Sequence, residues 1–447
     1  MTKHAAAAVA LAATTLVSAA QAGPSLTIYT HDLGFVRESR TLELRAARDT
    51  VRLEDVSSML DFSSVRLAPA NGRVTRLAYR WDVANGDALI ERAVGQRVRV
   101  LSRGDRVAEG VLVAADGLWL VLRGDDGAIR SQARATVEEV SLANPGRALS
   151  LKPAIEAVVE GGKGSTRADL TYLTGGLSWS AEHTLVRTGE NTATWGTVVQ
   201  VQNTTGRAYA DARLQLVAGE PSRTAAPAPK MEYAMMARVS AADAGGAPDP
   251  GMTEQAFADY HLYTLTGDVT LRDRETQSLV MYDPRPVQVT PRYLYRGGAQ
   301  GVLSQLILVN DAKSGTGQPL PAGRVRFFEP DAAKQLQFTG ETNIRHTASD
   351  EKLTMEVGTA FDLAAERVQK SDRRISDRER EYSMEIKLRN RKSNTVTIVV
   401  EEPLGGDITV TQQSHPSVRK DAGTLQFDIV VPAGKEVVVT YTARQRW

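Results

Sequence analysis

Apolar and polar residues alternate along most of the chain, and this period of two constrains the fold more than any other feature. The alternation is clear in short runs such as SLTIYTHD, GFVRESRTLEL and DTVRLEDV, each bounded by turn-forming residues. Successive side chains of a β-strand point to opposite faces, so such runs predict half-buried strands. We therefore predict an all-β protein made of immunoglobulin-like β-sandwich modules, with a small SH3-like barrel inserted among them.

The first 22 residues are predicted to be a secretory signal peptide. Lys3 and His4 precede the apolar run Ala5 to Leu16, and Ala20-Gln21-Ala22 is a small-residue cleavage pattern. Cleavage after Ala22 would place the mature chain in the periplasm or outside the cell. No later apolar run reaches the roughly 18 residues of a membrane-spanning helix, so we expect no transmembrane span.

The charge balance argues against several classes of partner. The chain has 54 Lys and Arg against 53 Asp and Glu, and loss of residues 1–22 would remove Lys3 and no acid, leaving 53 of each sign. Such a chain has no net field that attracts nucleic acid or anionic lipid, so we expect no nucleic-acid binding. It also has no Cys, and its length is sufficient to bury several cores without disulfides.

Changes of pattern divide the mature chain into five segments. Residues 23–94 form an N-terminal β module that ends in NGDALIERAV, a short helix with Asn85 or Asp87 as its N-cap. Residues 95–145 hold about five short strands separated by Arg-Gly-Asp, Ala-Asp-Gly and Asp-Asp-Gly, which suit tight hairpins. This segment predicts the SH3-like barrel, and we expect Trp119 in its core.

Longer strands return after this segment. Residues 146–220 form part of a β-sandwich, and residues 257–447 form a C-terminal β-sandwich. Between them, residues 221–256 are rich in Ala, Pro and Met and lack alternation, which predicts a flexible insertion. Charged residues 371–381 are flanked by alternating runs, so we expect a strand pair with a polar turn there.

One stretch resembles a hydrolase site. DLTYLTGGLSWSAEHTLVRTGE places Asp169, Ser178, Ser180 and His183 around a Gly-Gly pair. A nucleophile elbow needs a strand-to-helix turn, but no helical pattern follows here. On a strand, the two serines would share one face and His183 the other, which disfavours a Ser-His dyad.

The same stretch is better explained as two strands joined at a bend. Tyr172 and Trp179 are the predicted core anchors on either side of the bend, and Gly175 and Gly176 supply backbone angles that a Cβ would oppose. These four residues form a structural motif. We expect Gly175→Val to impair folding and Ser178→Ala to have little effect.

Other candidate motifs do not predict chemistry. The mature chain contains five histidines, none of which is paired at a metal-ligand spacing, and GGKGST and SDEK both stand where turns are expected. We therefore expect no catalytic, metal-binding or cofactor-binding residues and no bound cofactor.

Several stretches resemble a known family. YLTGGLSWSAEHTLV, GTVVQVQNTTGRAYADARLQLVAGE, DYHLYTLTGDVTLRDRETQSLVMY, GRVRFFEPD and EIKLRNRKSNTVTIVVEEPLGGD are similar to a widespread exported bacterial family of unknown function. Its C-terminal β domain is shared with proteins named mucoidy inhibitors. The resemblance covers about Ser165 to Trp447 and implies an exported, β-rich protein, but it carries over no catalytic residue. The chain departs from the mucoidy-inhibitor type because Gly95–Ala143 replaces a long coiled coil.

Two functions remain open from the sequence. The first is an exported, non-enzymatic cell-envelope protein that acts through its β-domain surfaces on an envelope protein or a glycan. The second is a carbohydrate-binding protein or hydrolase whose site is assembled from distant strands. In that case Trp81, Trp195 or Tyr295 would stack on sugar rings, and Glu182 with Asp169 would act as acid and base. The sequence does not indicate an oligomeric state.

Overall fold

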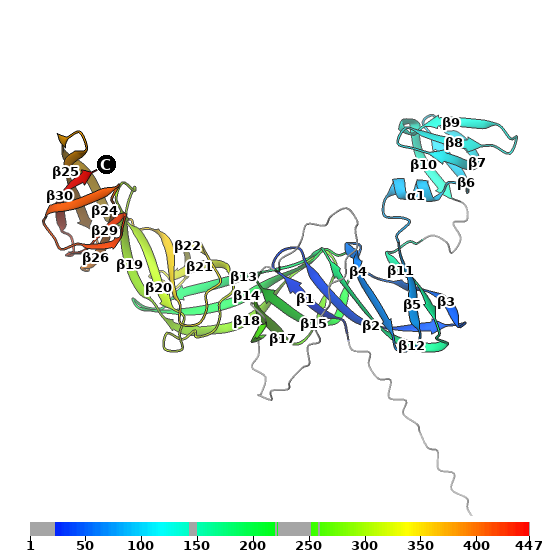
Figure 1. The fold of residues 1–447 in the computed structure, drawn as a ribbon, viewed down its shortest axis with the longest axis horizontal. Coiled ribbons are helices and arrows are strands. Elements are labelled where there is room, and N and C mark those ends of the chain that lie inside the picture. The colour runs from blue at the N-terminus through cyan, green and yellow to red at the C-terminus, as the bar shows by residue number, and fades with distance from the viewer. Residues whose placement is uncertain (1–22, 143–149, 220, 222–251, 258–259, 447) are drawn as a thin grey trace, which may run out of the picture.

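The structure is a computed structural model that describes residues 23–142, 150–219, 221, 252–257 and 260–446. Nearly all of the regular structure in this part of the chain is β-strand, arranged in six sheets. The sheets follow one another along an elongated molecule, with the SH3-like segment at one end and the C-terminal strands at the other (Figure 1). The prediction of an all-β fold made of sandwich modules is confirmed.

A seven-stranded sheet combines strands from four of the predicted segments, in the order β16-β17-β15-β1-β2-β12-β4. Its strands are β1 (Ser25–Tyr29), β2 (Gly34–Leu44), β4 (Leu60–Pro69), β12 (Gly164–Thr174), β15 (Tyr209–Ala218), β16 (Met252–Phe257) and β17 (Tyr260–Leu271). A three-stranded sheet accompanies it, with β11 (Ala154–Glu160) between β3 (Arg48–Glu54) and β5 (Arg73–Arg80). Residues 23–94 and 146–220 are therefore interleaved in space.

Strand β16 corrects one expectation. Its residues 252–256 belong to the segment predicted to be a flexible insertion, but they pair in register with β17, from Met252 opposite Leu265 to Phe257 opposite Tyr260. The alternation is hard to recognise because the strand is short and sits at a sheet edge. Residues 222–251, like the predicted signal peptide, lie outside the described residues.

The SH3-like segment forms its own sheet in the order β10-β6-β7-β8-β9. Helix α1 (Gly86–Arg92) precedes it, and the side chain of Asn85 caps the helix by accepting a hydrogen bond from the Ala88 N–H. The strands are β6 (Arg97–Ser102), β7 (Arg106–Ala115), β8 (Trp119–Arg123), β9 (Ile129–Ala133) and β10 (Val137–Leu142), with a 3-10 turn (Arg134–Thr136) before the last. The described pairs do not join β9 to β10, so this sheet is not closed into the predicted barrel.

Trp119 is not a core residue, contrary to expectation. Its side chain is 46% exposed, whereas Leu120 and Leu122 on the same strand are buried. The run GLWLVLR is apolar at both odd and even positions, so the sequence does not reveal which set faces inward. The two leucines fill the small core, and the pleat then directs Trp119 to the surface.

The rest of the chain forms three further sheets. A central five-stranded sheet has the order β18-β14-β13-β21-β22, a six-stranded sheet the order β23-β20-β19-β26-β29-β28, and a four-stranded sheet the order β24-β25-β30-β27. The strands of the central sheet are β13 (Leu177–Arg187), β14 (Thr192–Asn203), β18 (Glu275–Gln288), β21 (Gly323–Pro330) and β22 (Leu336–Ile344). Those of the six-stranded sheet are β19 (Thr290–Arg296), β20 (Leu303–Val309), β23 (Lys352–Thr359), β26 (Val396–Pro403), β28 (Val418–Asp421) and β29 (Thr424–Val431). Those of the four-stranded sheet are β24 (Leu363–Ser376), β25 (Glu379–Asn390), β27 (Asp407–Gln413) and β30 (Glu436–Arg446).

The polar stretch at residues 371–381 is a hairpin, as predicted. Strands β24 and β25 pair from Leu363 opposite Asn390 to Ser376 opposite Glu379, with a tight turn between them. Cross-strand ion pairs such as Arg373–Glu381 (2.8 Å) replace apolar contacts along its exposed end. Charges of opposite sign on neighbouring strands explain how so polar a sequence remains a strand pair.

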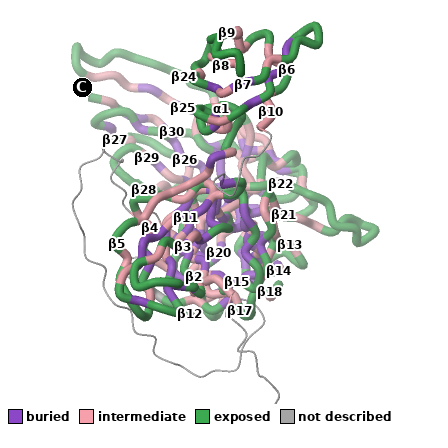
Figure 2. Tube along the Cα trace, turned by 90° about the vertical axis from the view of Figure 1, so that its right-hand side faces the viewer, coloured by how far each residue is buried: buried purple, intermediate pink, exposed green. Residues whose placement is uncertain are grey.

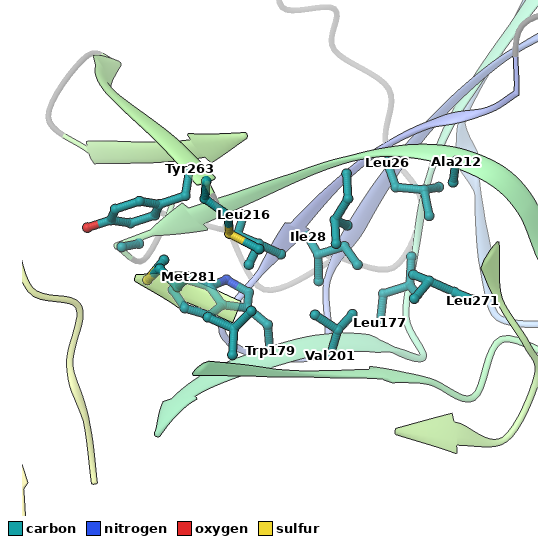
Figure 3. Packing of buried hydrophobic residues seen from close by; sticks show 14 of the residues in the cluster. Leu26, Ile28, Leu177, Trp179, Val201, Ala212, Leu216, Tyr263, Leu271 and Met281 are labelled. Atoms are coloured by element: carbon teal, nitrogen blue, oxygen red, sulfur yellow. The ribbon is translucent and has the colours of Figure 1, made fainter. Parts of the chain in front are cut away.

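Buried residues gather toward the middle of the trace, and exposed residues lie mostly along its outside (Figure 2). One continuous core runs from the three-stranded sheet through the seven-stranded and central sheets to the six-stranded sheet, and a second core lies between the six- and four-stranded sheets. Figure 3 shows the middle of the first core, where Leu26, Ile28 and Leu216 of the seven-stranded sheet pack over Trp179 and Val201 of the central sheet. The sheets are thus shared between successive sandwiches, which makes the row of modules continuous.

Three asparagines repeat the same structural device along the row. Asn203 ends β14, Asn310 follows β20 and Asn390 ends β25. The two N–H groups of each Nδ2 are shared among three backbone carbonyls: Asn203 with Arg207, Leu271 and Arg272; Asn310 with Gln318, Thr347 and Ala348; Asn390 with Asn394, Val431 and Pro432. Each asparagine therefore joins the end of its strand to a neighbouring segment at the same point of its sandwich.

Candidate functional site

A groove of about 840 Å³ lies where the seven-stranded sheet meets the central sheet. Its walls come from the end of β1, from β13 and from the β21–β22 hairpin. The lining residues are Thr30, His31, residues 179–182, residues 322–324 and residues 341–346. The groove thus borders the Gly-Gly stretch that resembled a hydrolase site.

The groove exists because β13 is longer than the strand beside it. Strand β13 pairs with β14 from Leu177 onward, but its pairing with β21 begins only at Ala181, opposite Gly323. Gly323 allows this close start, since a Cβ there would lie 2.3 Å from the Ala181 carbonyl oxygen. Residues 177–180 of β13 therefore have no neighbouring strand of the central sheet on the groove side.

Backbone hydrogen-bonding groups of β13 point into this gap. The Thr204 N–H donates to the Gly176 carbonyl at 2.7 Å, which makes these two residues a hydrogen-bonded pair of the β13–β14 ladder. Pairing alternates along an antiparallel ladder, so Ser178 and Ser180 also bond toward β14. The N–H and C=O of Trp179 consequently point to the opposite edge, which borders the groove.

A carboxylate held by two guanidinium groups dominates the electrostatics of one wall. Glu182 accepts hydrogen bonds from Arg324 Nε (3.1 Å), Arg324 Nη2 (2.9 Å) and Arg326 Nη1 (2.9 Å). Glu341 lies 3.8 Å from Arg324 and 3.6 Å from Arg326. Hydrogen bonding to Glu182 and its negative charge raise the pKa of Arg324. These four side chains neutralise one another.

The histidines of the groove are anchored locally. His346 Nδ1 accepts a hydrogen bond from the Ala322 N–H at 3.0 Å, and His31 Nδ1 lies 2.9 Å from Thr30 Oγ1. Within the part of the chain that the structure describes, no group of three or more His, Asp or Glu residues could hold a metal ion.

The apparent Ser-His arrangement is separated by the pleat of β13. His183 is fully buried, with Nδ1 2.9 Å from Thr197 Oγ1 and Nε2 3.1 Å from the Pro321 carbonyl oxygen. Burial lowers its pKa to about 4, so the imidazole is neutral at pH 7. Ser178 lies on the opposite face, 3.5 Å from Gln202 Oε1. The histidine is a core residue.

The four residues predicted to form the structural motif at the bend differ in burial and in backbone conformation. Tyr172 and Trp179 are 0% and 3% exposed, and the Trp179 indole donates to the Val217 carbonyl at 3.2 Å. Gly176 has a φ of +79°, and a Cβ there would lie 2.9 Å from Met59 Sδ. Gly175, in contrast, has no positive φ, and a Cβ there would lie 3.3 Å from its nearest neighbour. The expectation that Gly175 is conformationally constrained is wrong, because the turn places its left-handed residue at Gly176.

The candidate carbohydrate-binding residues do not gather in one place. Trp195 and Tyr295 are each 1% exposed, so neither can stack on a sugar, while Trp81 is half-buried at the end of the N-terminal module. Asp169 lies on β12 of the seven-stranded sheet, 3.9 Å from Arg37, whereas Glu182 lies on β13 of the central sheet. The structure does not unite them in an acid-base pair.

The part of the groove wall that the β21–β22 hairpin forms was not predicted from the sequence. Arg324, Glu341 and Arg345 line the groove, although more than 140 residues separate them from Glu182 in the chain. The alternation in GRVRFF places Arg324 and Arg326 on one face of a strand and was a usable signal. Their partner was not predictable, since nothing local indicates that β13 and β21 run parallel and adjacent.

Fold and site define a protein made of β-sandwiches in series, with a groove between two of them. Residues 168–447 match the family described as "Domain of unknown function (DUF4139)", and the chain belongs to this family. The match begins within β12, so it includes the β13, β21 and β22 walls of the groove but not Thr30 and His31. No curated protein matches the chain. None of the helices in the described residues is long and apolar enough to cross a membrane.

Proposed function

We propose that this chain is an exported, non-enzymatic protein of the cell envelope that acts by binding an envelope component. The apolar run and the Ala20-Gln21-Ala22 pattern within residues 1–22 support export. The resemblance to an exported bacterial family related to the mucoidy inhibitors supports a place in a bacterial envelope. The specific role proposed for those proteins is not extended to this chain, because the SH3-like segment stands where they have a coiled coil.

The observation that carries the non-enzymatic part is the state of Glu182. It belongs to the stretch at residues 169–190 that resembles a hydrolase site, and its oxygens accept three hydrogen bonds from guanidinium groups. A general acid or base must be free to exchange a proton with a substrate. Glu182 instead fixes Arg324 and Arg326 in place, so the wall of the groove is arranged as a rigid recognition surface.

The arrangement of sheets supports binding through backbone edges. Strands β16, β4, β22 and β24 each lie at the end of a sheet in the pairing order. Edge strands present unpaired N–H and C=O groups to which a partner can add a strand. An elongated row of sandwiches offers many such edges along its length (Figure 1).

The alternative function, a carbohydrate-binding protein or hydrolase, has less support. Two of its three aromatic candidates are buried, and its two carboxylates lie on different sheets. Stacking on a sugar needs an exposed ring face, which only Trp81 among the three could supply in part.

The proposal is tested with the purified mature chain as bait in a solubilised envelope fraction, alongside a deletion strain. We expect capture of a defined envelope component and an altered envelope in the deletion strain. A matched bait with Gly176→Val, which disturbs the bend, controls for non-specific capture. If the bait captures nothing beyond this control and the deletion strain has a normal envelope, the proposal is wrong.

A further inference from the structure

We propose that the groove beside β13 binds an extended, acidic peptide segment of a partner protein, which adds to the edge of β13 at Trp179 as a short strand. This inference rests on the proposed function and deepens it by naming the site and the chemistry of the partner. Three independent features of the groove support it: an open backbone edge, sufficient space and one unengaged cation.

The open edge is supplied by the early part of β13. Pairing with β21 starts at Ala181, and the alternation of the β13–β14 ladder directs the N–H and C=O of Trp179 toward the groove. A peptide in extended conformation can form hydrogen bonds with both groups. It would then lie beside β13 as an additional strand of the central sheet. Trp179 itself is held rigidly, since its ring is buried and hydrogen-bonded to Val217.

The space matches a few residues of extended chain. The groove volume of about 840 Å³ falls within the roughly 300–1,000 Å³ typical of ligand sites. Ser180, Thr342 and Asn343 line it with hydroxyl and amide groups that can bond to polar side chains or to peptide groups. The lining combines apolar surface with backbone and side-chain hydrogen-bonding groups, which suits a peptide that carries both apolar and polar side chains.

The charge of the partner follows from Arg345. Glu182, Glu341, Arg324 and Arg326 neutralise one another. In contrast, the exposed guanidinium of Arg345 makes no hydrogen bond or ion pair with the described residues. Arg345 borders the groove at the end of β22. A guanidinium binds a carboxylate through two parallel hydrogen bonds, so a Glu or Asp side chain is the natural counterpart.

The test uses three synthetic six-residue peptides and the full mature chain. One alternates Val with Glu, one alternates Val with Lys, and the third is the Glu peptide with N-methylated backbone amides. Fluorescence anisotropy of labelled peptides measures affinity. We expect the Glu peptide to bind, and the Lys and N-methyl peptides to bind at least tenfold more weakly.

Variants locate the binding site. Arg345→Glu should weaken binding of the Glu peptide at least tenfold, and Asn343→Trp, which fills the groove, should abolish it. Arg66→Glu on β4 is the matched control, because Arg66 is also an exposed strand arginine but lies outside the groove. Equal affinity for the N-methyl peptide, no binding of the Glu peptide, or no effect of Arg345→Glu would each overturn the inference.

The inference and the proposed function fail in different ways. If the Arg345→Glu bait captures the same envelope component as the wild type, the component binds elsewhere and the groove assignment is wrong, while the proposed function stands. If the wild-type bait captures no component and the deletion strain has a normal envelope, the proposed function fails whatever the peptides do.

Discussion

The guanidinium of Arg207 and the carboxylate of Glu38 form a buried ion pair, with Nη1 3.1 Å from Oε1 and Nη2 3.3 Å from Oε2. Both side chains are less than a tenth exposed, and Arg207 also donates to the Tyr172 hydroxyl at 3.2 Å. Glu38 lies midway along β2, so the pair fixes the seven-stranded sheet beside the Gly-Gly bend. The bend and its tyrosine therefore depend on this pair.

Removal of the Glu38 charge should destabilise the protein strongly. Glu38→Gln would leave Arg207 buried with a weakened partner set, and breaking a buried pair costs about 3–5 kcal/mol. The free energy of unfolding in urea measures the effect. Arg73→Ala is the control, since the Arg73–Glu160 pair is exposed and we expect a loss of about 1 kcal/mol or less. A similar loss in both variants would contradict this interpretation of the buried pair.

The two glycines of the bend should differ in their tolerance of alanine. Gly176→Ala requires a φ of +79° and places a Cβ 3.0 Å from the backbone of Thr204 and Thr205, so we expect a loss of about 1–3 kcal/mol. Gly175→Ala meets no such backbone contact and should cost less than about 1 kcal/mol. Thermal unfolding of both variants measures the difference. The reverse order would show that the bend is assigned to the wrong residue.

The buried His183 should make stability depend on pH. Burial lowers its pKa in the folded protein to about 4, below the 6.5 of an unfolded histidine. The unfolded state therefore takes up a proton first as the pH falls, and stability that is complete above pH 6.5 declines between pH 6.5 and 4 by up to about 3 kcal/mol. The change in unfolding free energy between pH 7 and 4.5 should be smaller for His183→Gln. The partly exposed His415→Gln is the control. Equal pH dependence in all three proteins would refute the prediction.

The three asparagine connections should each stabilise their own sandwich. Asn310→Leu removes the hydrogen bonds of its Nδ2 to the carbonyls of Gln318, Thr347 and Ala348, and the loss of a hydrogen bond costs about 0.5–1.5 kcal/mol each. We expect a lower unfolding midpoint and faster amide hydrogen exchange around Thr347. Exchange around Val431, whose carbonyl accepts a hydrogen bond from Asn390, should not change. A uniform increase in both regions would show that the connections do not act locally.

The sequence predicts local structure well where residues close in the chain decide it. The helix capped by Asn85 and the hairpin around Asp377 follow from a capping residue and from alternation with a turn. The inward direction of Leu120 rather than Trp119 was not predictable, because the strand is apolar on both faces. Only packing against the small core decides between them.

The groove could not be predicted from local sequence patterns, because it is formed by strands that are distant in the chain. It needs β1, β13 and β21, which are brought together by the seven-stranded sheet and by parallel pairing across more than 130 residues. The stretch at residues 169–190 supplies one wall of the groove, but its sequence indicates only two strands joined at a bend. The open edge arises from the length difference between β13 and β21, which cannot be deduced until the register is known.

The central claim, that the protein works by binding an envelope component, is tested most directly by crosslinking in intact cells followed by mass spectrometry. We expect reproducible crosslinks between exposed strand edges of this chain and a defined envelope component. Arg345→Glu should reduce the crosslinks at sites on β22 or near residue 345. A chain that is exported and folded but yields no intermolecular crosslinks above a strain lacking it would contradict the claim.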